Sequence, residues 1–412
     1  MKKKILIRGP VLSQSGYGEQ ARFALRALKS REDLFDVFIV PIAWGKTGWI
    51  WEESEFRRWM DERITLTQVL LQRKQLAPDI SLQVTIPNEF QKLAPVNIGF
   101  TAGIETNKCS PEWLPKCNEM DKLLVVSNHA KSSIVDTIAY ATNKKSGESF
   151  EYKCQVETEV VWENTPRHEP EPINELNLTT DFNFLAVSQI SPRKNFDNMV
   201  KWFVEEFVDQ EVGLILKTSL ISNSIMDWEH LDKRVTALLE PYSERKCKVY
   251  LLHGDLTPGQ MTWLYNHDNI KNFVNIAHGE GFGLPMFEAA REGLPVTTIG
   301  WSGQLDFLHH DGKDLFNKVD YTMQPVQREA VWPGVIEEDT MWAFADQGSY
   351  KNALRKVYQH HDEMLQLAEE AQDLVDSKFR DEVLFEGFCD AIYKPDQKQE
   401  EWMTELNEME NL

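Results

Sequence analysis

Residues 275–288 read Asn275-Ile276-Ala277-His278-Gly279-Glu280-Gly281-Phe282-Gly283-Leu284-Pro285-Met286-Phe287-Glu288. This run is a glycine-rich loop, and residues 273–276 at its start predict a short buried strand. Pro285 suits the first turn of a helix, where its missing N–H costs nothing, and Gly293 suits the position just after the helix end. Residues 296–299 predict the next strand. A strand, a helix and a strand in this order form a βαβ unit, which implies a parallel sheet.

The loop has the composition of a binding site. In parallel sheets ligands bind beyond the carboxyl ends of the strands, where this loop lies. Gly281 and Gly283 allow close approach of a ligand, and the free amides at the helix start favour an anion. Glu280 and Glu288 have seven residues between them, and ionised carboxylates accept hydrogen bonds but donate none. A ligand that carries both phosphate and hydroxyl groups suits this mixture, as a nucleotide sugar does.

Strands and helices alternate along the chain, which is the pattern of doubly wound α/β domains. The alternation is interrupted at residues 163–180, a polar stretch with three prolines that predicts a linker. We therefore expect two Rossmann-like domains, residues 1–165 and 181–381, followed by a helical segment, residues 382–412. Strands are expected at residues 5–7, 37–40, 96–100, 123–126, 156–161, 184–187, 214–217 and 249–252, and helices at residues 21–28, 130–138, 196–207 and 258–265 and from about residue 230.

Composition narrows the class of protein. The formal net charge of -21 disfavours a large basic surface for nucleic acid or anionic lipid, although a local groove near Arg57, Arg58 and Arg73 stays compatible with DNA. No segment approaches the roughly 18 consecutive apolar residues that span a bilayer, and the N-terminal residues meet a charge too soon for a signal peptide, so we expect a cytoplasmic protein. The 5 cysteines fit neither a disulfide framework nor a zinc ligand set.

Two further loops carry candidate ligand-binding residues. Arg193 and Lys194 follow the first strand of the second domain, where two cations can neutralise a diphosphate leaving group, although a solvated turn has the same composition. Gly16 and Gly18 follow the first strand of the chain and can lie close to phosphates. The alternative for this pair is a tight strand-to-helix turn, because the third glycine of the dinucleotide fingerprint is absent.

The spacing from Glu280 to Glu288, with Gly281-Phe282-Gly283-Leu284-Pro285 inside it, resembles retaining nucleotide-sugar glycosyltransferases of the GT-B fold. The glycosyl transferases group 1 family is the closest resemblance, over about residues 183–310. It implies two domains that face an interdomain cleft, with the donor on the second domain and the acceptor on the first, and a last helix that returns to the first domain. It also implies that donor sugar and phosphate contact Glu280 and the amides of Gly281, Phe282, Gly283 and Leu284.

The same resemblance implies roles for single residues and one departure from the pattern. Glu288 would hold the ribose hydroxyls, and Lys194 matches the phosphate-binding lysine of the family. Gln189, a further candidate for donor binding, stands where the family usually has arginine, and Arg193 is the candidate replacement for that cation. Glu105 resembles a glutamate that follows a first-domain strand in a subset of the family, which makes it a candidate for contacting sugar or acceptor. A helix-capping role is the alternative for Glu105.

Other side chains carry less specific signals. His278 and His253 can border the cleft, but neutral structural histidines are the default interpretation. We expect no metal and no permanently bound cofactor, since the adjacent pair His309-His310 points apart and the spacing places no third ligand. The 13 tryptophans include candidates for a sugar-stacking platform in the first domain, although core packing is the default. The candidates are Trp44, Trp49 and Trp51.

The sequence thus predicts a retaining glycosyltransferase that moves a sugar from a nucleoside-diphosphate sugar to a hydroxyl of a glycan or a small-molecule acceptor. Two alternatives stay open. One is a transferase that modifies DNA bases, as some phage enzymes of this broad fold do, although the acidity of the chain disfavours it. The other is a non-catalytic nucleotide-sugar or glycan binder, which the missing arginine at Gln189 suggests.

Overall fold

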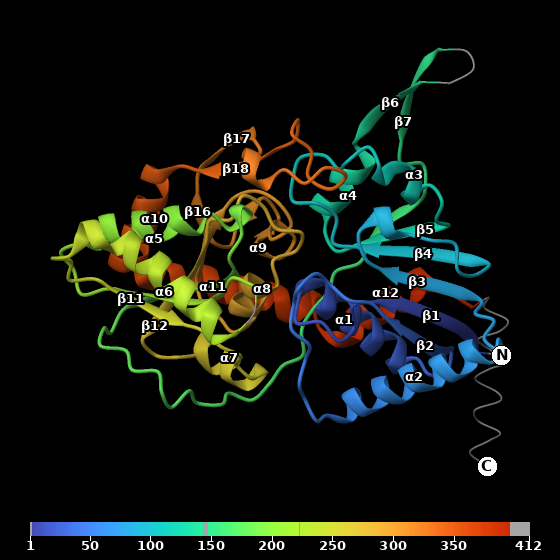
Figure 1. Ribbon diagram of the computed structural model, residues 1–412. Helices are drawn as coiled ribbons and strands as arrows, with labels where there is room; N and C mark the ends of the chain where they lie inside the picture. Colours follow the sequence, from blue (N-terminus) through green and yellow to red (C-terminus); the bar gives the residue numbers. More distant parts are fainter. Residues whose placement is uncertain (1, 143–146, 222, 396–412) are drawn as a thin grey trace.

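The computed structural model describes residues 2–142, 147–221 and 223–395. Two α/β domains lie side by side (Figure 1), each built on its own six-stranded parallel sheet. The first sheet has the strand order β2-β1-β3-β4-β5-β8. Its strands are β1 (Lys3–Gly9), β2 (Phe35–Pro41), β3 (Ile80–Val84), β4 (Val96–Thr101), β5 (Lys122–Val125) and β8 (Thr158–Val160).

Helices and one hairpin surround the first sheet. The Ser15 side chain caps helix α1, whose buried face carries Ala21, Ala24, Leu25 and Leu28 at helical spacing. A helix was expected at residues 130–138, but it ends at Val135, and Ile138 already belongs to a β-hairpin that projects from the domain (Figure 1). The elements are α1 (Gly16–Ser30), α2 (Glu55–Gln72), α3 (Trp113–Cys117), α4 (Asn128–Val135), β6 (Ile138–Thr142) and β7 (Ser149–Lys153), with a 3-10 turn η1 (Pro87–Glu89).

The second sheet has the order β11-β10-β9-β12-β13-β16. Strand β12 runs parallel to β13, with Phe273 opposite Val296, so the predicted βαβ unit is confirmed. Residues 163–180, between the two sheets, contain no helix or strand. The strands are β9 (Asn183–Gln189), β10 (Gly213–Ser219), β11 (Lys248–Leu252), β12 (Ile270–Asn275), β13 (Val296–Ile299) and β16 (Asn317–Val319).

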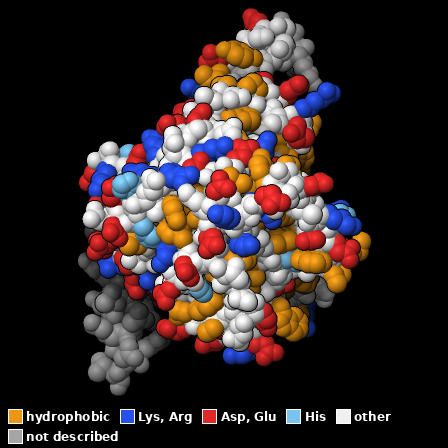
Figure 2. Space-filling view, turned by 90° about the vertical axis from the view of Figure 1, so that its left-hand side faces the viewer, with side chains coloured by type: hydrophobic (Ala, Val, Ile, Leu, Met, Phe, Trp, Pro, Cys, Tyr) orange, Lys and Arg blue, Asp and Glu red, His pale blue; other side chains and the backbone are white. Residues whose placement is uncertain are grey.

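The helices of the second domain cover both faces of its sheet. Helices α5 and α7 have the predicted bounds, whereas α6 begins at Ile225, about one turn before the predicted start. Figure 2 shows acidic, basic and apolar side chains interspersed over the outer face of this domain. The elements are α5 (Phe196–Phe207), α6 (Ile225–Leu239), α7 (Pro258–Tyr265), α8 (Leu284–Arg291), α9 (Leu305–Leu308), α10 (Gln347–Gln359) and α11 (His361–Lys378), the 3-10 turns η2 (Pro192–Lys194), η3 (Glu240–Tyr242) and η4 (Arg328–Ala330), and the hairpins β14 (His309–His310) with β15 (Lys313–Asp314) and β17 (Tyr321–Pro325) with β18 (Met341–Ala345).

The last described helix, α12 (Asp381–Ile392), lies on the first domain. Phe388 packs against Phe23 of α1, with 5.5 Å between the ring centroids, and the Cys389 thiol donates to the Ala27 carbonyl. The chain therefore crosses between the domains twice, once in residues 163–180 and again just before α12. Residues 396–412 of the expected C-terminal segment lie outside the described residues.

A third connection holds the domains together. The segment 326–340, between β17 and β18, reaches across to the first domain, and we call it the clasp. Its Gly334 carbonyl accepts a hydrogen bond from Nε1 of the fully buried Trp113, at 2.9 Å. Ser110 donates to Glu337, and Lys108 pairs with Asp339.

Within the described part of the chain, no helix combines the length and the apolar character needed to cross a membrane.

Candidate functional site

The glycine-rich loop lies where the two domains meet. A side chain at Gly281 would meet the Ala102 carbonyl of the first domain at 2.7 Å, so the space that this glycine leaves open is occupied by protein backbone. Gly283 adopts a φ of +101°, which glycine tolerates, and it begins helix α8 with Pro285 in the first turn. Phe282 turns into the core and packs against Phe307. The backbone of the first domain and the core of the second domain therefore hold the loop from two sides.

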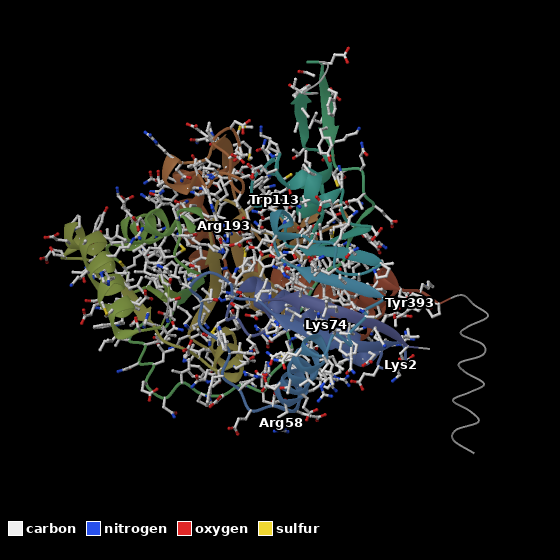
Figure 3. The ribbon with its side chains drawn as sticks, turned by 45° about the vertical axis from the view of Figure 1, so that its right-hand side comes forward. Lys2, Arg58, Lys74, Trp113, Arg193 and Tyr393 are labelled. Atoms are coloured by element: carbon white, nitrogen blue, oxygen red, sulfur yellow. The ribbon has the colours of Figure 1, made fainter. Side chains whose placement is uncertain are left out.

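Four of the predicted site residues form one charged cluster. Glu280 bonds to Arg193 at 2.7 Å through one carboxylate oxygen and to Lys194 at 2.5 Å through the other. Arg193 also donates to the Gly279 carbonyl and forms an ion pair with Glu105 of the first domain, at 3.2 Å. Figure 3 shows Arg193 at the boundary of the two domains. Two carboxylates and two cations thus lie together, although they come from three distant parts of the chain.

Glu280 is buried, the other three residues of the cluster are half-buried, and the charges control one another. Burial by itself would raise the pKa of Glu280, but the adjacent Lys194 and Arg193 outweigh it and lower the pKa to about 2. Burial and the neighbouring Arg193 lower the pKa of Lys194, while Glu280 opposes them. Glu280 is therefore ionised at neutral pH. Arg193 is occupied by two carboxylates and a carbonyl, whereas Lys194 contacts one carboxylate oxygen.

Glu288 lies in a cavity of about 410 Å³ between the domains. The Tyr265 hydroxyl donates to its carboxylate at 2.9 Å, and burial raises the pKa of Glu288. Gly16 lines the same cavity from the first domain, with open space around its Cα. The wall consists of Gln14, Ser15, Gly16 and Glu19 from the first domain, Thr165, Pro166 and His168 from the linker, and Leu256, Pro258, Met261, Thr262, Tyr265, Leu284, Pro285, Glu288 and Arg291 from the second.

Two residues predicted to bind the donor lie apart from these groups. A side chain at Gly18 would meet the Ser13 carbonyl at 2.1 Å, so this glycine is required by the turn that starts α1. Gln189 is exposed and donates to the Leu220 carbonyl at 2.9 Å, and the structure gives it no contact with the charged cluster. The tight-turn interpretation therefore explains Gly18, while Gly16 faces the cavity.

The two histidines have protein partners. One ring nitrogen of His278 bonds to the Ala343 carbonyl and the other lies 2.9 Å from the Gln327 amide, while burial lowers the pKa of His278 to about 4. His253 bonds to Asp227. Both contacts fit the default interpretation of structural histidines. Among the described residues, no group of three or more His, Cys, Asp or Glu side chains is arranged to hold a metal ion.

Sequence reasoning overlooked several residues that join the domains at this site. Ser127 donates to the Gly281 carbonyl, and Asp306 accepts from the backbone of Asn128 at 2.9 Å and from the Trp162 indole at 2.8 Å. Within the first domain, Tyr17 bonds to Thr101 at 2.9 Å and so fixes the loop that faces the second domain. Tyr17 lies between Gly16 and Gly18, so the local sequence indicated a position near the site. No local pattern indicated the role of Asp306, because its partners are more than a hundred residues away in the sequence.

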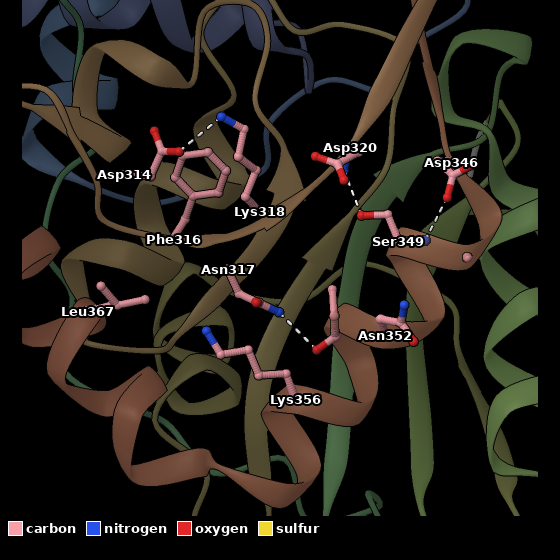
Figure 4. Close-up of a pocket in the computed structure, with 12 residues that line it drawn as sticks. Asp314, Phe316, Asn317, Lys318, Asp320, Asp346, Ser349, Asn352, Lys356 and Leu367 are labelled. Carbon is pink, nitrogen blue, oxygen red and sulfur yellow. Dashed lines mark hydrogen bonds and ion pairs between the residues drawn. The ribbon is translucent and has the colours of Figure 1, made fainter.

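A further cavity, of about 750 Å³, lies elsewhere (Figure 4). It opens on the second domain between β16 and α10, where Lys318 pairs with Asp314 and Ser349 bonds to both Asp320 and Asp346. None of the predicted site residues lines it. We therefore locate the candidate site in the interdomain cavity and the adjoining charged cluster.

Comparisons with known proteins identify the fold. No protein-family model and no curated protein sequence matches the chain. Solved structures do match it over nearly its whole length. Sucrose-phosphate synthase from Thermosynechococcus elongatus has a TM-score of 0.62 at 12% identity, with 94% of this chain and 98% of that chain covered. Anabaena HepE in complex with UDP and glucose has a TM-score of 0.59 at 12% identity, with the same coverage of 94% and 98%.

A third similar structure is the lipopolysaccharide outer core galactosyltransferase WaaB in its apo form. Its TM-score is 0.52 at 13% identity, with 95% of this chain and 99% of that chain covered. At this level of identity the likeness concerns the fold. The chain has the GT-B fold, with two doubly wound Rossmann-like domains that face an interdomain cleft, as the sequence predicted.

Proposed function

We propose that this protein is a retaining glycosyltransferase that moves a sugar from a nucleoside-diphosphate sugar to a hydroxyl of a glycan or another acceptor. The observation that carries the proposal is the position of Glu288 and Gly16 on opposite walls of one interdomain cavity. The charged cluster around Glu280 supplies the second part of the site. Anabaena HepE, which shares the fold, was solved in complex with UDP and glucose.

The nucleoside is proposed to occupy the cavity. Glu288 accepts hydrogen bonds from the ribose hydroxyls, and apolar side chains such as Leu256 and Met261 offer contacts to the base. The diphosphate then points along the start of α8, where the free amides of residues 281–284 and the helix dipole favour an anion. The sugar reaches Glu280, which is ionised and accepts hydroxyl hydrogen bonds.

Lys194 is the proposed electrostatic catalyst. The bond between the anomeric carbon and the phosphate oxygen breaks and the diphosphate leaves with the electron pair, while the acceptor oxygen bonds to the anomeric carbon and its proton passes to the leaving diphosphate. A buried ammonium group stabilises this negative charge more than water does. Arg193 contributes to the same field while it holds Glu280 and Glu105 in place. We assign no protein nucleophile.

The experiment that tests this proposal is incubation with a panel of nucleotide sugars, with released nucleotide detected by mass spectrometry. Lys194→Met should slow release about a hundredfold or more, as the loss of a transition-state donor does elsewhere. Lys201→Met, on the solvent-exposed side of α5, is the matched control and should leave release unchanged. Intact donor binding without release or transfer would favour the non-catalytic binder. Absence of donor binding would overturn the proposal.

A further inference from the structure

Three tryptophans lie close together on the loop 42–54, which connects β2 to α2 in the first domain. Trp113 and Trp342 are fully buried, but Trp49 is 69% exposed and Trp51 is 93% exposed. Core packing therefore does not explain Trp49 and Trp51. Exposed aromatic groups of this size mark sites of interaction, because water contact with so large an apolar surface is unfavourable.

The loop is fastened to a wall of the interdomain cavity. The Gln14 amide donates to the Gly48 carbonyl, and the Ile50 amide donates to the Leu12 carbonyl, each at 2.8 Å. Ser13 and Thr47 share a hydroxyl hydrogen bond of 2.6 Å. Gln14 lines the cavity, and Trp49 pairs through its backbone with the adjacent Ser13, so this part of the loop lies next to a wall of the cavity. The three tryptophans are not among the described residues that line the cavity.

The inner end of the loop leads toward the charged cluster. The ring of Trp44 lies on the ring of Tyr17, with 4.3 Å between the centroids. The Tyr17 hydroxyl bonds to Thr101 and to the backbone amide of Ala102, in the turn that also carries Glu105. Trp44 and Tyr17 thus connect the loop to the turn that carries Glu105.

We propose that Trp44, Trp49 and Trp51 form a platform on which a neutral oligosaccharide acceptor stacks. This inference rests on the proposed function and adds the acceptor class to it. A pyranose ring presents a face of C–H groups that an indole covers well, while its hydroxyl groups stay at the solvated rim.

The charges around the loop favour a neutral acceptor over a polyanion. Glu52, Glu53 and Glu55 follow the tryptophans and repel phosphate or carboxylate polymers. Arg57, a candidate for contacting DNA, is engaged by Asp61 at 3.0 Å and by the Ile50 carbonyl at 3.0 Å. The acidic neighbours and the occupied arginine favour the glycan over the DNA duplex.

The test is a binding titration of the full chain without any donor. Maltohexaose, chitohexaose and a short DNA duplex are the probes, followed by calorimetry and by protein fluorescence. We expect at least one oligosaccharide to bind and the double variant Trp49→Ala/Trp51→Ala to weaken it about tenfold or more. Trp228→Ala, a partly exposed tryptophan on α6, is the matched control and should not change the affinity.

Three outcomes would overturn the platform: no oligosaccharide binding, equal binding by the double variant, or salt-sensitive binding of the duplex alone. This test can fail without the proposed function failing, because the titration needs no donor. Nucleotide-sugar binding is measured in parallel, and the double variant should keep it. If the wild type binds no nucleotide sugar, the proposed function is wrong, while the oligosaccharide titration still tests the platform.

Discussion

Glu105 of the first domain pairs with Arg193 of the second, with 3.2 Å between Oε1 and Nη2. Arg193 holds Glu280 at the same time, so one guanidinium group connects the two domains to the carboxylate that is proposed to meet the donor sugar. A contact between the domains and the orientation of Glu280 therefore depend on the same side chain. The pair also explains why Glu105 lies at the site although it is far from the glycine-rich loop in sequence.

Glu105→Gln removes the interdomain charge but keeps the shape of the side chain. We expect transfer to slow roughly tenfold while the melting temperature stays close to that of the wild type, since a partly exposed ion pair adds little stability. Steady-state kinetics and calorimetry measure the two effects. Glu119→Gln, which affects an exposed pair with Lys116, is the control. Wild-type turnover would leave Glu105 with a capping or surface role.

Glu288→Ala should weaken nucleotide-sugar binding by about one to two orders of magnitude, because hydrogen bonds to a charged group contribute about 1.5–3 kcal/mol each. Isothermal calorimetry with the donor found in the panel measures this directly. Glu244→Ala, at an exposed position that is not part of the cavity wall, should bind like the wild type. Unchanged affinity of the Glu288 variant would remove the ribose-binding role.

Glu163 predicts a pH dependence of stability. Burial raises its pKa from 4.5 to about 8, the charge of Glu19 adds to the shift and Arg26 opposes it. Among the described residues, Oε2 of Glu163 has no hydrogen-bond partner. Between pH 4.5 and about 8 Glu163 keeps a proton in the folded state that it has lost in the unfolded state. The free energy of unfolding therefore falls as the pH rises, by at most about 1.4 kcal/mol per pH unit.

Glu163→Gln should therefore flatten the curve between pH 4.5 and about 8 and stabilise the protein at the upper end. Urea unfolding at a series of pH values is the measurement. Glu244→Gln, at an exposed position, should leave the slope as it is in the wild type. Parallel curves for the wild type and the Glu163 variant would mean that this carboxyl group titrates normally.

The clasp predicts a difference between two buried tryptophans. Trp113 donates from Nε1 to Gly334 of the clasp, whereas Nε1 of Trp342 has no partner among the described residues. Trp113→Phe loses a hydrogen bond and leaves a buried carbonyl unsatisfied, at a cost of about 1–3 kcal/mol beyond the change in volume. Trp342→Phe changes the volume equally and loses no such bond. Denaturant unfolding should show the larger loss for Trp113→Phe, and equal losses would contradict the role of the clasp.

Much of the second domain was predictable because its signals are local. Helices α5 and α7 have the predicted bounds, since apolar periodicity, Pro258 and the Thr257 cap mark them within one or two turns of chain. The helix expected at residues 130–138 was wrong at its end, because Ile138, Tyr140 and Thr142 are residue types that favour a strand and lie in β6. The clasp and Asp306 had no local pattern that indicated their contacts across the cleft.

The βαβ unit, the alternation of two α/β domains and the spacing of Glu280 and Glu288 follow from the sequence, because each of these depends on neighbours in the chain. The contact of Glu105 with Arg193, the first-domain backbone that fills the space at Gly281, and the exposure of Trp51 beside the burial of Trp113 arise in the folded chain. These relationships depend on how residues from distant segments pack. Packing between domains is a property of the folded surfaces, and no local periodicity encodes it.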